Sequence, residues 1–359
     1  MNEQHSHPEF PRWMIYGANG YTGEMIAREA VRRGFRPVLA GRRQETVDSL
    51  ARNLGLEAHA FALDNPAELL RQLEGCALVL NCAGPFSATA APLMEACLQT
   101  RTHYLDITGE IDVFEAAQLL NTRARDAGVV LCPGVGFDVI PTDCVAAVLK
   151  EALPDAIRLN LGFDSRSVFS PGTAKTAIEG LAQGGKIRRG GKIITVPLAY
   201  EVRRIDFGDG EKDAMTIPWG DVSTAYYTTG IPDIQVFVPG STRMISQARR
   251  ANYIRPLLRL AWVQKLLKAY ISRTVKGPGE MKREQTPSFV WGEAINARGD
   301  KKTARIRTPN GYTLTIMGSL AVVEHLMMNR IAGGAYTPAT LMGANLITRL
   351  PGAGPLRIV

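Results

Sequence analysis

The sequence lacks the patterns that mark several large classes of protein. No tyrosine is followed by a lysine four residues later, so the Tyr-x-x-x-Lys acid pair of short-chain reductases is absent. No apolar run is long enough to span a bilayer, and no helix-turn-helix or RNP pattern indicates nucleic-acid binding. The cysteines form no C-x-x-C pair, which disfavours a zinc site and favours reduced thiols; they are Cys76, Cys82, Cys97, Cys132 and Cys144.

What the chain does have is enough apolar sequence for a large folded protein. Its 359 residues, 45% of them hydrophobic, suffice for two domains. We interpret its formal charge of +8 as spread along the chain, with an anionic cofactor or an acidic substrate accounting for part of it. Residues 1–11 are polar and lack a charged-then-apolar signal, so we expect a disordered leader, with no metal at His5 and His7, on a cytoplasmic protein.

A glycine-rich turn predicts a nucleotide ligand. It lies between a strand-like run, 13–16, and a helix-like run, 24–33. Glycines allow a close approach to a pyrophosphate, and a helix start offers free N–H groups. The spacing is G-x-x-G-x-x-G rather than the standard G-x-G-x-x-G. A glycine-rich turn of this kind can also be a plain connector that binds no ligand. The residues we expect to contact the cofactor here are Gly17, Asn19, Gly20, Tyr21, Thr22 and Gly23.

The end of the second expected strand indicates which cofactor is bound. An NAD site usually has an acidic residue there, to hold the ribose hydroxyls. This chain instead has Arg42 and Arg43. Because guanidinium groups pair with a 2′-phosphate, the pair favours NADP(H) over NAD(H), although it would also suit a solvated helix start.

Two further strand ends fit a nucleotide domain. Asp64 follows the run 58–63, where this fold places the adenine. The run 77–80 ends in small residues that would let the cofactor pass close to the backbone. We expect cofactor contacts there from Asn81, Ala83, Gly84 and Pro85.

The pattern of elements predicts an α/β protein in two parts. Strand and helix alternate over 12–145, as in a doubly wound parallel Rossmann sheet, with strands at 13–17, 37–41, 58–62, 77–82, 103–106 and 129–132. Over 146–318 strand-like runs predominate, as in an α+β domain with a mixed or antiparallel sheet. Its expected strands are 157–163, 192–206, 214–217, 224–228, 234–238, 288–297, 302–308 and 312–317, its helices 173–183 and 241–270, and its lid-like loop 277–285. Residues 319–359 are expected to form helices that return to the first domain.

Five motifs together resemble the saccharopine dehydrogenase-like oxidoreductases, and within them the trans-acting enoyl reductase branch. They are the glycine turn, Ala40-Gly41-Arg42, Asn81-Cys82-Ala83-Gly84-Pro85-Phe86, Tyr104-Leu105-Asp106-Ile107-Thr108-Gly109-Glu110 and Pro133-Gly134-Val135-Gly136-Phe137-Asp138. The match is dense over 12–145 and thin afterwards. The resemblance implies an NADP-binding Rossmann domain, a second domain inserted before the C-terminal helices, and hydride transfer between the two.

Four polar residues follow the fifth and sixth strands, where the nicotinamide is expected. They are Tyr104, Asp106, Glu110 and Asp138, with Tyr104 as the leading proton donor and Asp106 as its partner. Structural roles compete with these assignments. Asp106 or Glu110 would also suit the cap of the following helix, and Asp138 would suit an anchor between the domains.

The sequence leaves three interpretations of the function open, and they belong to different classes. The first is NADPH-dependent reduction of an apolar, enoyl-type acyl chain, free or bound to a carrier; the second is a saccharopine-type imine reduction; the third is a non-catalytic, lipid-associated protein. The second needs convergent arginines, which would come from Arg158, Arg166, Arg188, Arg189, Arg203 and Arg204. Basic and leucine residues interleave over 241–270, so this helix would suit a membrane surface, an acidic carrier protein or packing on the core. Assembly into an oligomer is compatible with the sequence.

Overall fold

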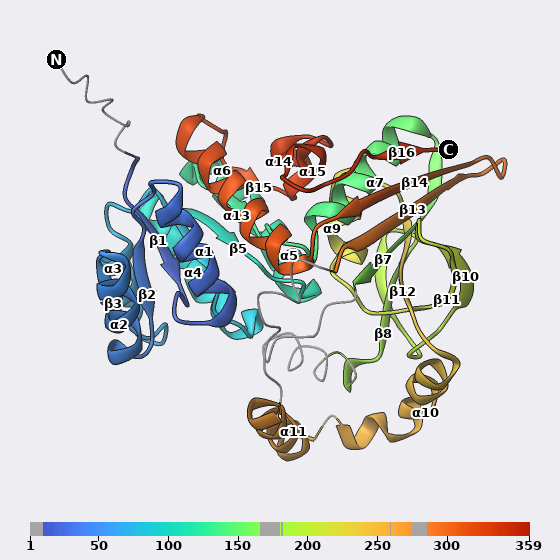
Figure 1. Ribbon diagram of the computed structural model, residues 1–359, viewed down its shortest axis with the longest axis horizontal. Coiled ribbons are helices and arrows are strands. Elements are labelled where there is room, and N and C mark those ends of the chain that lie inside the picture. Colours follow the sequence, from blue (N-terminus) through green and yellow to red (C-terminus); the bar gives the residue numbers. More distant parts are fainter. Residues whose placement is uncertain (1–9, 166–179, 181, 259, 275–285) are drawn as a thin grey trace.

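Two β-sheets lie side by side in the computed structural model, each covered by helices (Figure 1). The structure describes residues 10–165, 180, 182–258, 260–274 and 286–359. Outside these ranges lie most of the expected leader, most of the helix expected over 173–183, Arg166 and the whole of the lid-like loop over 277–285.

The N-terminal half alternates strands and helices, as the sequence predicts. Its strands are β1 Trp13–Tyr16, β2 Val38–Gly41, β3 Ala58–Ala60, β4 Leu78–Asn81, β5 His103–Asp106 and β6 Val130–Cys132. Its helices are α1 Tyr21–Arg32, α2 Gln44–Leu54, α3 Pro66–Leu73, α4 Phe86–Thr100, α5 Ile111–Leu119, α6 Asn121–Ala127 and α7 Ile140–Ala152. The expected α/β fold class is thereby confirmed.

The first sheet has the order β15-β6-β5-β4-β1-β2-β3, and every pairing in it is parallel. The strand order reverses between β1 and β4. Ligands of such sheets bind beyond the carboxyl ends of the strands at this switch point. The glycine turn after β1 and the loop after β4 therefore meet where a dinucleotide is expected.

Alternate residues of each strand supply two cores, one on either face of the first sheet. Trp13 and Ile15 point into one core, and Met14 and Tyr16 point into the other. All four β1 residues are buried. Burial on both faces explains why these strands read as short continuous apolar runs in the sequence.

The second sheet is mixed, as expected. Its strands are β7 Ala156–Ser165, β8 Gly185–Arg189, β9 Lys192–Val196, β10 Val202–Asp206, β11 Glu211–Thr216, β12 Asp233–Pro239, β13 Ser288–Asn296, β14 Lys301–Thr308 and β16 Arg357–Ile358. Only the pairing of β7 with β12 is parallel, and the other pairings are antiparallel. Leu159 and Leu161 of β7 join the core that includes α7, so the side chains between them face the opposite side of the sheet.

Among the described residues, three helices accompany the second sheet and three follow β14. They are α9 Asp221–Thr229, α10 Thr242–Leu258, α11 Ala261–Thr274, α13 Gly311–Met328, α14 Pro338–Met342 and α15 Leu346–Arg349. The chain then contributes to both sheets, because β15 Gly334–Ala335 pairs with β6 while β16 pairs with β14. None of the helices in the described ranges is long and apolar enough to cross a membrane.

Two expected strands are helices, which corrects the sequence-based assignment. Residues 224–228 lie in α9, where Val222 and Ala225 are buried in the α7 core and Gly230, at a φ of +70°, ends the helix. Residues 312–317 lie in α13, whose first turn is capped by the Asn310 side chain. Both segments are rich in β-branched and aromatic residues, so tertiary packing overrides their β propensity.

Candidate functional site

The three glycines of the first turn have different surroundings. Gly17 has a φ of +81°, and a Cβ there would lie 2.7 Å from the backbone nitrogen of Ala83. A Cβ on Gly23 would lie 2.4 Å from the carbonyl oxygen of Gly17. Gly20, in contrast, is exposed and precedes α1 with no side-chain cap on the helix start. Gly17 and Gly23 therefore allow the turn to close, and Gly20 leaves the helix N-terminus open to an anion.

Asn19, Tyr21 and Thr22 attach the turn to its neighbours. The Asn19 side-chain amide donates to Thr46 Oγ1 at 2.9 Å, and its Oδ1 lies over Gly41 at the end of β2. Tyr21 makes an edge-to-face contact with Tyr312 of α13, with ring centroids 5.2 Å apart. Tyr21 and Thr22 are both half-buried. The turn is thus held between α2 and the C-terminal helix α13.

Arg42 and Arg43 are exposed where β2 ends. Neither guanidinium has a hydrogen bond or an ion pair with the described part of the chain. Asp64, also exposed, lies beyond β3, and its charge and that of Arg42 act on the same Tyr16 hydroxyl. Burial is the main reason that the pKa of Tyr16 is raised to about 12. Two unpaired guanidinium groups at this place suit a 2′-phosphate.

Asn81 shapes the loop after β4 from inside the protein. Its Oδ1 accepts from the Ala83 backbone at 3.0 Å, and its Nδ2 donates to Thr89 Oγ1 at 3.0 Å and to the Tyr104 hydroxyl at 3.3 Å. Asn81 is fully buried, whereas Gly84 and Pro85 are exposed. The loop backbone at Ala83 to Pro85 is therefore the part that a cofactor can reach, and Asn81 positions it.

Tyr104 and Asp106 lie inside the Rossmann domain. Both are 0% exposed. The Tyr104 hydroxyl donates to Asp106 Oδ2 at 2.7 Å, and Oδ1 of the same carboxyl accepts from the backbone of Thr108 at 3.0 Å and of Gly134 at 2.8 Å. Burial raises the pKa of Asp106 to about 6, although these donors oppose the shift. The pair joins the ends of β5 and β6 and presents no proton to the surface.

Glu110 caps a helix other than the one that follows it. Its Oε1 accepts from the backbone of Phe86 at 2.9 Å and its Oε2 from that of Ser87 at 2.7 Å, at the first turn of α4. No side-chain cap bond links it to α5, the next helix in the sequence. A carboxylate is well placed at a helix N-terminus, so this geometry fixes the start of α4 against the loop after β5.

Asp138 differs from the other three candidates. It is partly buried after β6, and its Oδ2 lies beside Gly109 of the loop after β5. The described residues give its carboxyl no hydrogen-bond partner. Burial alone raises its pKa to about 7. A carboxyl with these properties at the carboxyl edge of the sheet can donate a proton near neutral pH.

The sequence did not reveal the residues that surround Asp138 from the second domain. The Trp219 indole donates to the Asp138 carbonyl oxygen at 2.9 Å. Its ring lies 4.8 Å from that of Phe163, which in turn lies 5.7 Å from Phe137. These aromatic residues come from three distant segments, so no local pattern could have brought them together. They give this side of the site an apolar character.

Two further carboxyls lie near the same place. Asp143 is buried and accepts hydrogen bonds from the Thr228 hydroxyl and from the backbone of Ala339. Asp221, the first residue of α9, is 0% exposed, and neither carboxyl oxygen has a partner. Burial raises its pKa well above the ordinary value, and the charges of Asp143 and Asp138 add to the shift. Among the described side chains, no group of three or more His, Cys, Asp or Glu residues could hold a metal ion.

The two domains are tied together through Glu115 of α5. Its Oε1 accepts from Arg188 Nη2 and from Ser223 Oγ, each at 2.6 Å, and its Oε2 accepts from the Tyr227 hydroxyl at 3.0 Å. Arg188 also donates to two backbone carbonyls and lies over the Tyr226 ring at 4.2 Å. We call this contact between α5, β8 and α9 the domain junction.

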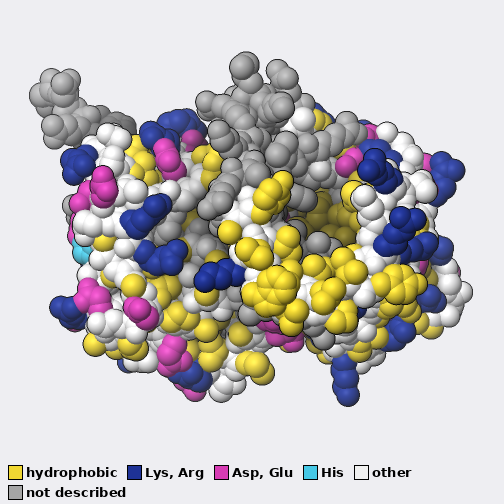
Figure 2. All heavy atoms as spheres, turned by 90° about the horizontal axis from the view of Figure 1, so that it is seen from below, with side chains coloured by type: hydrophobic (Ala, Val, Ile, Leu, Met, Phe, Trp, Pro, Cys, Tyr) yellow, Lys and Arg dark blue, Asp and Glu magenta, His cyan; other side chains and the backbone are white. Residues whose placement is uncertain are grey.

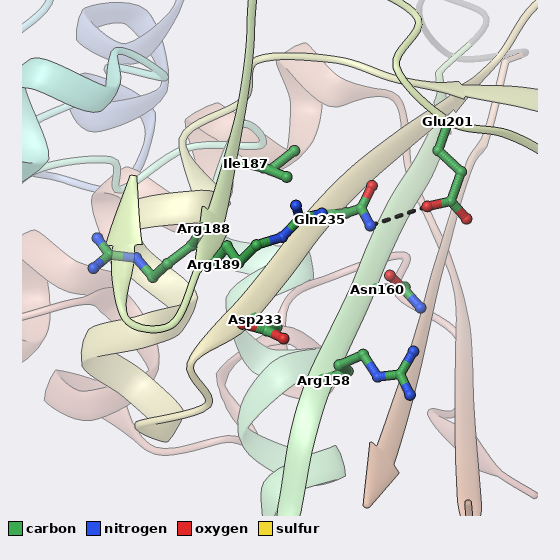
Figure 3. A pocket seen from close by; sticks show the side chains of 8 residues that line it. All are labelled: Arg158, Asn160, Ile187, Arg188, Arg189, Glu201, Asp233 and Gln235. Atoms are coloured by element: carbon green, nitrogen blue, oxygen red, sulfur yellow. Dashed lines mark hydrogen bonds between the residues drawn. The ribbon is translucent and has the colours of Figure 1, made fainter. Parts of the chain in front are cut away.

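A polar hollow of about 480 Å³ lies on the outer side of the second sheet (Figure 3). Its lining residues are Arg158, Asn160, Ile187, Arg188, Arg189, Glu201, Asp233 and Gln235. Figure 3 shows the guanidinium of Arg188 directed away from that of Arg158, and the donors of Arg188 are already used at the junction. Arg203 pairs with Glu293, and Arg204 with Glu211. The described arginines therefore do not converge on one anionic group.

Comparisons with known proteins agree with this geometry. Residues 13–132 match the family model of the saccharopine dehydrogenase NADP-binding domain. The human saccharopine dehydrogenase-like oxidoreductase is 27% identical, over 49% of this chain and 47% of its own length, so the match spans about half of that relative. A trans-acting enoyl reductase of Mycobacterium tuberculosis is 25% identical over 95% of this chain and 96% of its own length.

A solved structure supports the fold. Saccharopine dehydrogenase (L-Glu forming) of Saccharomyces cerevisiae aligns with a TM-score of 0.62 over 97% of this chain and 100% of its own, at 11% identity. At that identity the likeness concerns the fold alone. The family model, in contrast, covers the glycine turn, both arginines and the loop after β4. Residues 13–132 are therefore similar to the saccharopine dehydrogenase NADP-binding domain, which confirms both the predicted resemblance and the predicted nicotinamide cofactor.

Proposed function

We propose that the protein is an NADPH-dependent reductase of an apolar, enoyl-type acyl substrate, with Asp138 as the proton donor. The observation that carries this proposal is the Asp138 carboxyl, which is unpaired, has a pKa of about 7 and lies at the carboxyl edge of the Rossmann sheet. Tyr104, the donor favoured by the sequence, is fully buried and bonded to Asp106 and Asn81. We therefore transfer the role of proton donor from Tyr104 to Asp138.

The residues present fit a bound dinucleotide. The uncapped start of α1 and the exposed Gly20 would hold the pyrophosphate, and Arg42 and Arg43 would hold the 2′-phosphate. The backbone from Ala83 to Pro85 would border the nicotinamide half. When bound, the reduced cofactor supplies a hydride.

Asp138 would complete the reduction. Reduction of an enoyl thioester also requires a proton at the α-carbon, and the protonated Asp138 carboxyl would deliver it. Water would restore that proton. The Phe137, Phe163 and Trp219 rings would exclude water from an apolar chain, and each buried methylene would contribute about 0.8 kcal/mol to binding.

The substrate class is supported by what lies around Asp138. Burial alone shifts its pKa, so none of the described arginines or lysines is close enough to act on this carboxyl. A dicarboxylate substrate would require such cations, whereas an acyl chain would not. The likeness to trans-acting enoyl reductases over most of the chain points the same way.

A direct assay tests the proposal. NADPH oxidation would be followed with trans-2-enoyl thioesters of increasing chain length and, separately, with lysine plus 2-oxoglutarate, and the product would be identified by mass spectrometry. We expect saturated acyl thioesters, formed faster from longer chains. Turnover of only the amino-acid pair would instead establish the saccharopine-type reaction. NADPH binding without turnover of either would favour a non-catalytic protein.

A further inference from the structure

One long segment of the protein carries positive charge without any acidic residue. Between Thr242 and Thr274, the residues of α10, α11 and their connection, there are eight Lys and Arg residues and no Asp or Glu. The whole chain has a formal charge of +8, so the remainder is balanced between acidic and basic residues. This segment alone therefore carries as much net positive charge as the whole chain, so the charge is less evenly spread than the composition suggested.

Only one side of this segment is attached to the rest of the protein. Ile245 of α10 packs with Ala199 and Met215, and the side chain of Asn252 bonds to the backbone of Leu198 in both directions, at 2.8 and 3.2 Å. In α11 no described side chain is buried. In Figure 1 the two helices lie below the sheets, at the edge of the molecule.

The free side exposes large apolar side chains. Exposed fractions are 87% for Tyr253, 50% for Ile254, 60% for Leu257, 41% for Leu260, 64% for Trp262 and 62% for Leu266. We call these six residues the α10–α11 patch. Figure 2, which looks at the molecule from this side, shows hydrophobic side chains gathered together with Lys and Arg near them. The exposed leucines of this patch do not pack on the core, whereas Leu258 and Leu267 of the same segment are half-buried.

We propose that the α10–α11 patch docks on the surface of an anionic lipid membrane. Leucine and aromatic side chains enter the boundary between headgroups and acyl chains, and neighbouring Lys and Arg bind anionic headgroups. In α11, Trp262 and Leu266 are four residues apart and so share one face, while the intervening Lys265 is also exposed. The proposal depends on charge and exposure, not on the reaction proposed above.

The positive charge of the segment is complementary to an anionic lipid surface. The size of the apolar patch favours that lipid surface over an acidic protein as the partner. Each exposed leucine or tryptophan costs free energy in water unless something covers it. An acidic protein that paired only with Arg249, Arg250 and Lys265 would leave those side chains in water. A bilayer interface satisfies both requirements along two helices at once.

Vesicle binding by the full chain is the primary test. Vesicles of phosphatidylcholine alone and of phosphatidylcholine with phosphatidylglycerol would be used in flotation assays without substrate, at low and high salt. We expect binding to the anionic vesicles, weakened by salt. Trp262 provides a second signal, because Trp13 and Trp291 are buried and Trp219 is partly buried. Its fluorescence should shift to the blue on binding, and Trp262→Phe should abolish most of that shift while binding persists.

Matched variants separate the patch from the surface in general. The triple change Leu257→Ser, Trp262→Ser and Leu266→Ser should weaken vesicle binding on the order of a hundredfold. Its control is Leu119→Ser, because Leu119 is 86% exposed on α5 of the Rossmann domain.

A second pair of variants isolates the charge. Arg249→Ala with Arg250→Ala should weaken binding to anionic vesicles about 25-fold, with little change for neutral ones. The control here is Arg330→Ala with Arg357→Ala, two exposed arginines outside α10 and α11.

Three results would overturn the proposal. They are absence of binding to anionic vesicles by the folded protein, binding that the patch variants leave unchanged, and capture of purified acyl carrier protein in place of vesicles. The last result would assign the surface to an acidic protein. None of these binding assays requires turnover, so their results can be interpreted even if the enoyl reductase proposal fails.

Discussion

Buried carboxyl groups have opposite hydrogen-bond environments at the carboxyl edge of the Rossmann sheet and at the neighbouring start of α9. At the sheet edge, Asp106 accepts three hydrogen bonds, from Tyr104, Thr108 and Gly134. At the start of α9, Asp221 is equally buried and has no well-placed donor on either carboxyl oxygen, although the nearby Thr142 hydroxyl opposes the rise in its pKa. Asp138 lies between the two regions, partly buried and unpaired. Paired carboxyls fix the shape of the site, and unpaired ones hold protons that can be given up.

Asp138→Asn is expected to have the largest effect on activity. The amide cannot release a proton, so turnover should fall about 100- to 10,000-fold while NADPH affinity stays within about twofold. The unmodified enzyme should lose activity as the pH rises through about 7, because the acid must be protonated to act. Steady-state kinetics and NADPH titration provide both readouts. A variant with near-normal turnover would return the proton donor to Tyr104 or to another group.

Asp106→Ala should cost the most stability. The backbone N–H groups of Thr108 and Gly134 and the Tyr104 hydroxyl would lose their acceptor inside the core. We expect the free energy of unfolding to fall by about 3–5 kcal/mol, measured by urea denaturation. A loss below about 1 kcal/mol would show that this pairing does not hold the edge together.

Gly20→Val should separate the ligand role of the turn from its structural one. A Cβ on Gly20 would meet only the Gly17 carbonyl oxygen, at 3.2 Å, whereas at Gly23 it would lie at 2.4 Å from the same atom. We therefore expect Gly20→Val to stay folded by circular dichroism and to bind NADPH at least about 100-fold more weakly. Gly23→Val should instead destabilise the fold. Unchanged NADPH binding by a folded Gly20→Val protein would make the turn a plain connector.

The site residues at the carboxyl edge of the first sheet could be predicted from the sequence far better than those at the start of α9. Glycine spacing and apolar runs are local, so the order of the first six strands and the cofactor turn follow from them. Asp138 was found for the same reason, since it follows a strand. Trp219 and Asp221 gave no such signal, because their role depends on packing α9 against the Rossmann domain. The burial of Tyr104 is likewise a property of the assembled sheet, in which Asn81 comes from the neighbouring strand.

Arg42→Ala should have a moderate and selective effect. With the 2′-phosphate partner removed, the dissociation constant of NADPH should rise about tenfold and that of NADH should not change. Arg52→Ala, at the exposed far end of α2, is the matched control. Equal affinities of the unmodified protein for NADPH and NADH would rule out the role assigned to Arg42 and Arg43.

Asp221→Asn should not destabilise the protein, which sharpens the contrast with Asp106. In the folded protein the pKa of Asp221 is raised, so its favourable contribution is present at low pH and is lost as the pH rises. An amide resembles the protonated acid and does not ionise in the unfolded chain, so we expect little change in stability near pH 4 and a gain that grows as the pH rises through neutrality. Urea denaturation across this range would show it. A large loss at neutral pH would mean that the carboxylate is ionised and paired.

The late return of the chain to both sheets has a consequence for synthesis on the ribosome. Strand β15 is needed to complete the sheet edge at β6, and Tyr312 supports the cofactor turn, yet both come after strands β7 to β14 of the second sheet. The Ala339 backbone that bonds Asp143 is made later still. Nascent chains should therefore keep an unfinished sheet edge and an unsupported nucleotide turn until the segment from Tyr312 to Ala339 has been added. Binding of the cofactor would then report that this segment has joined the fold.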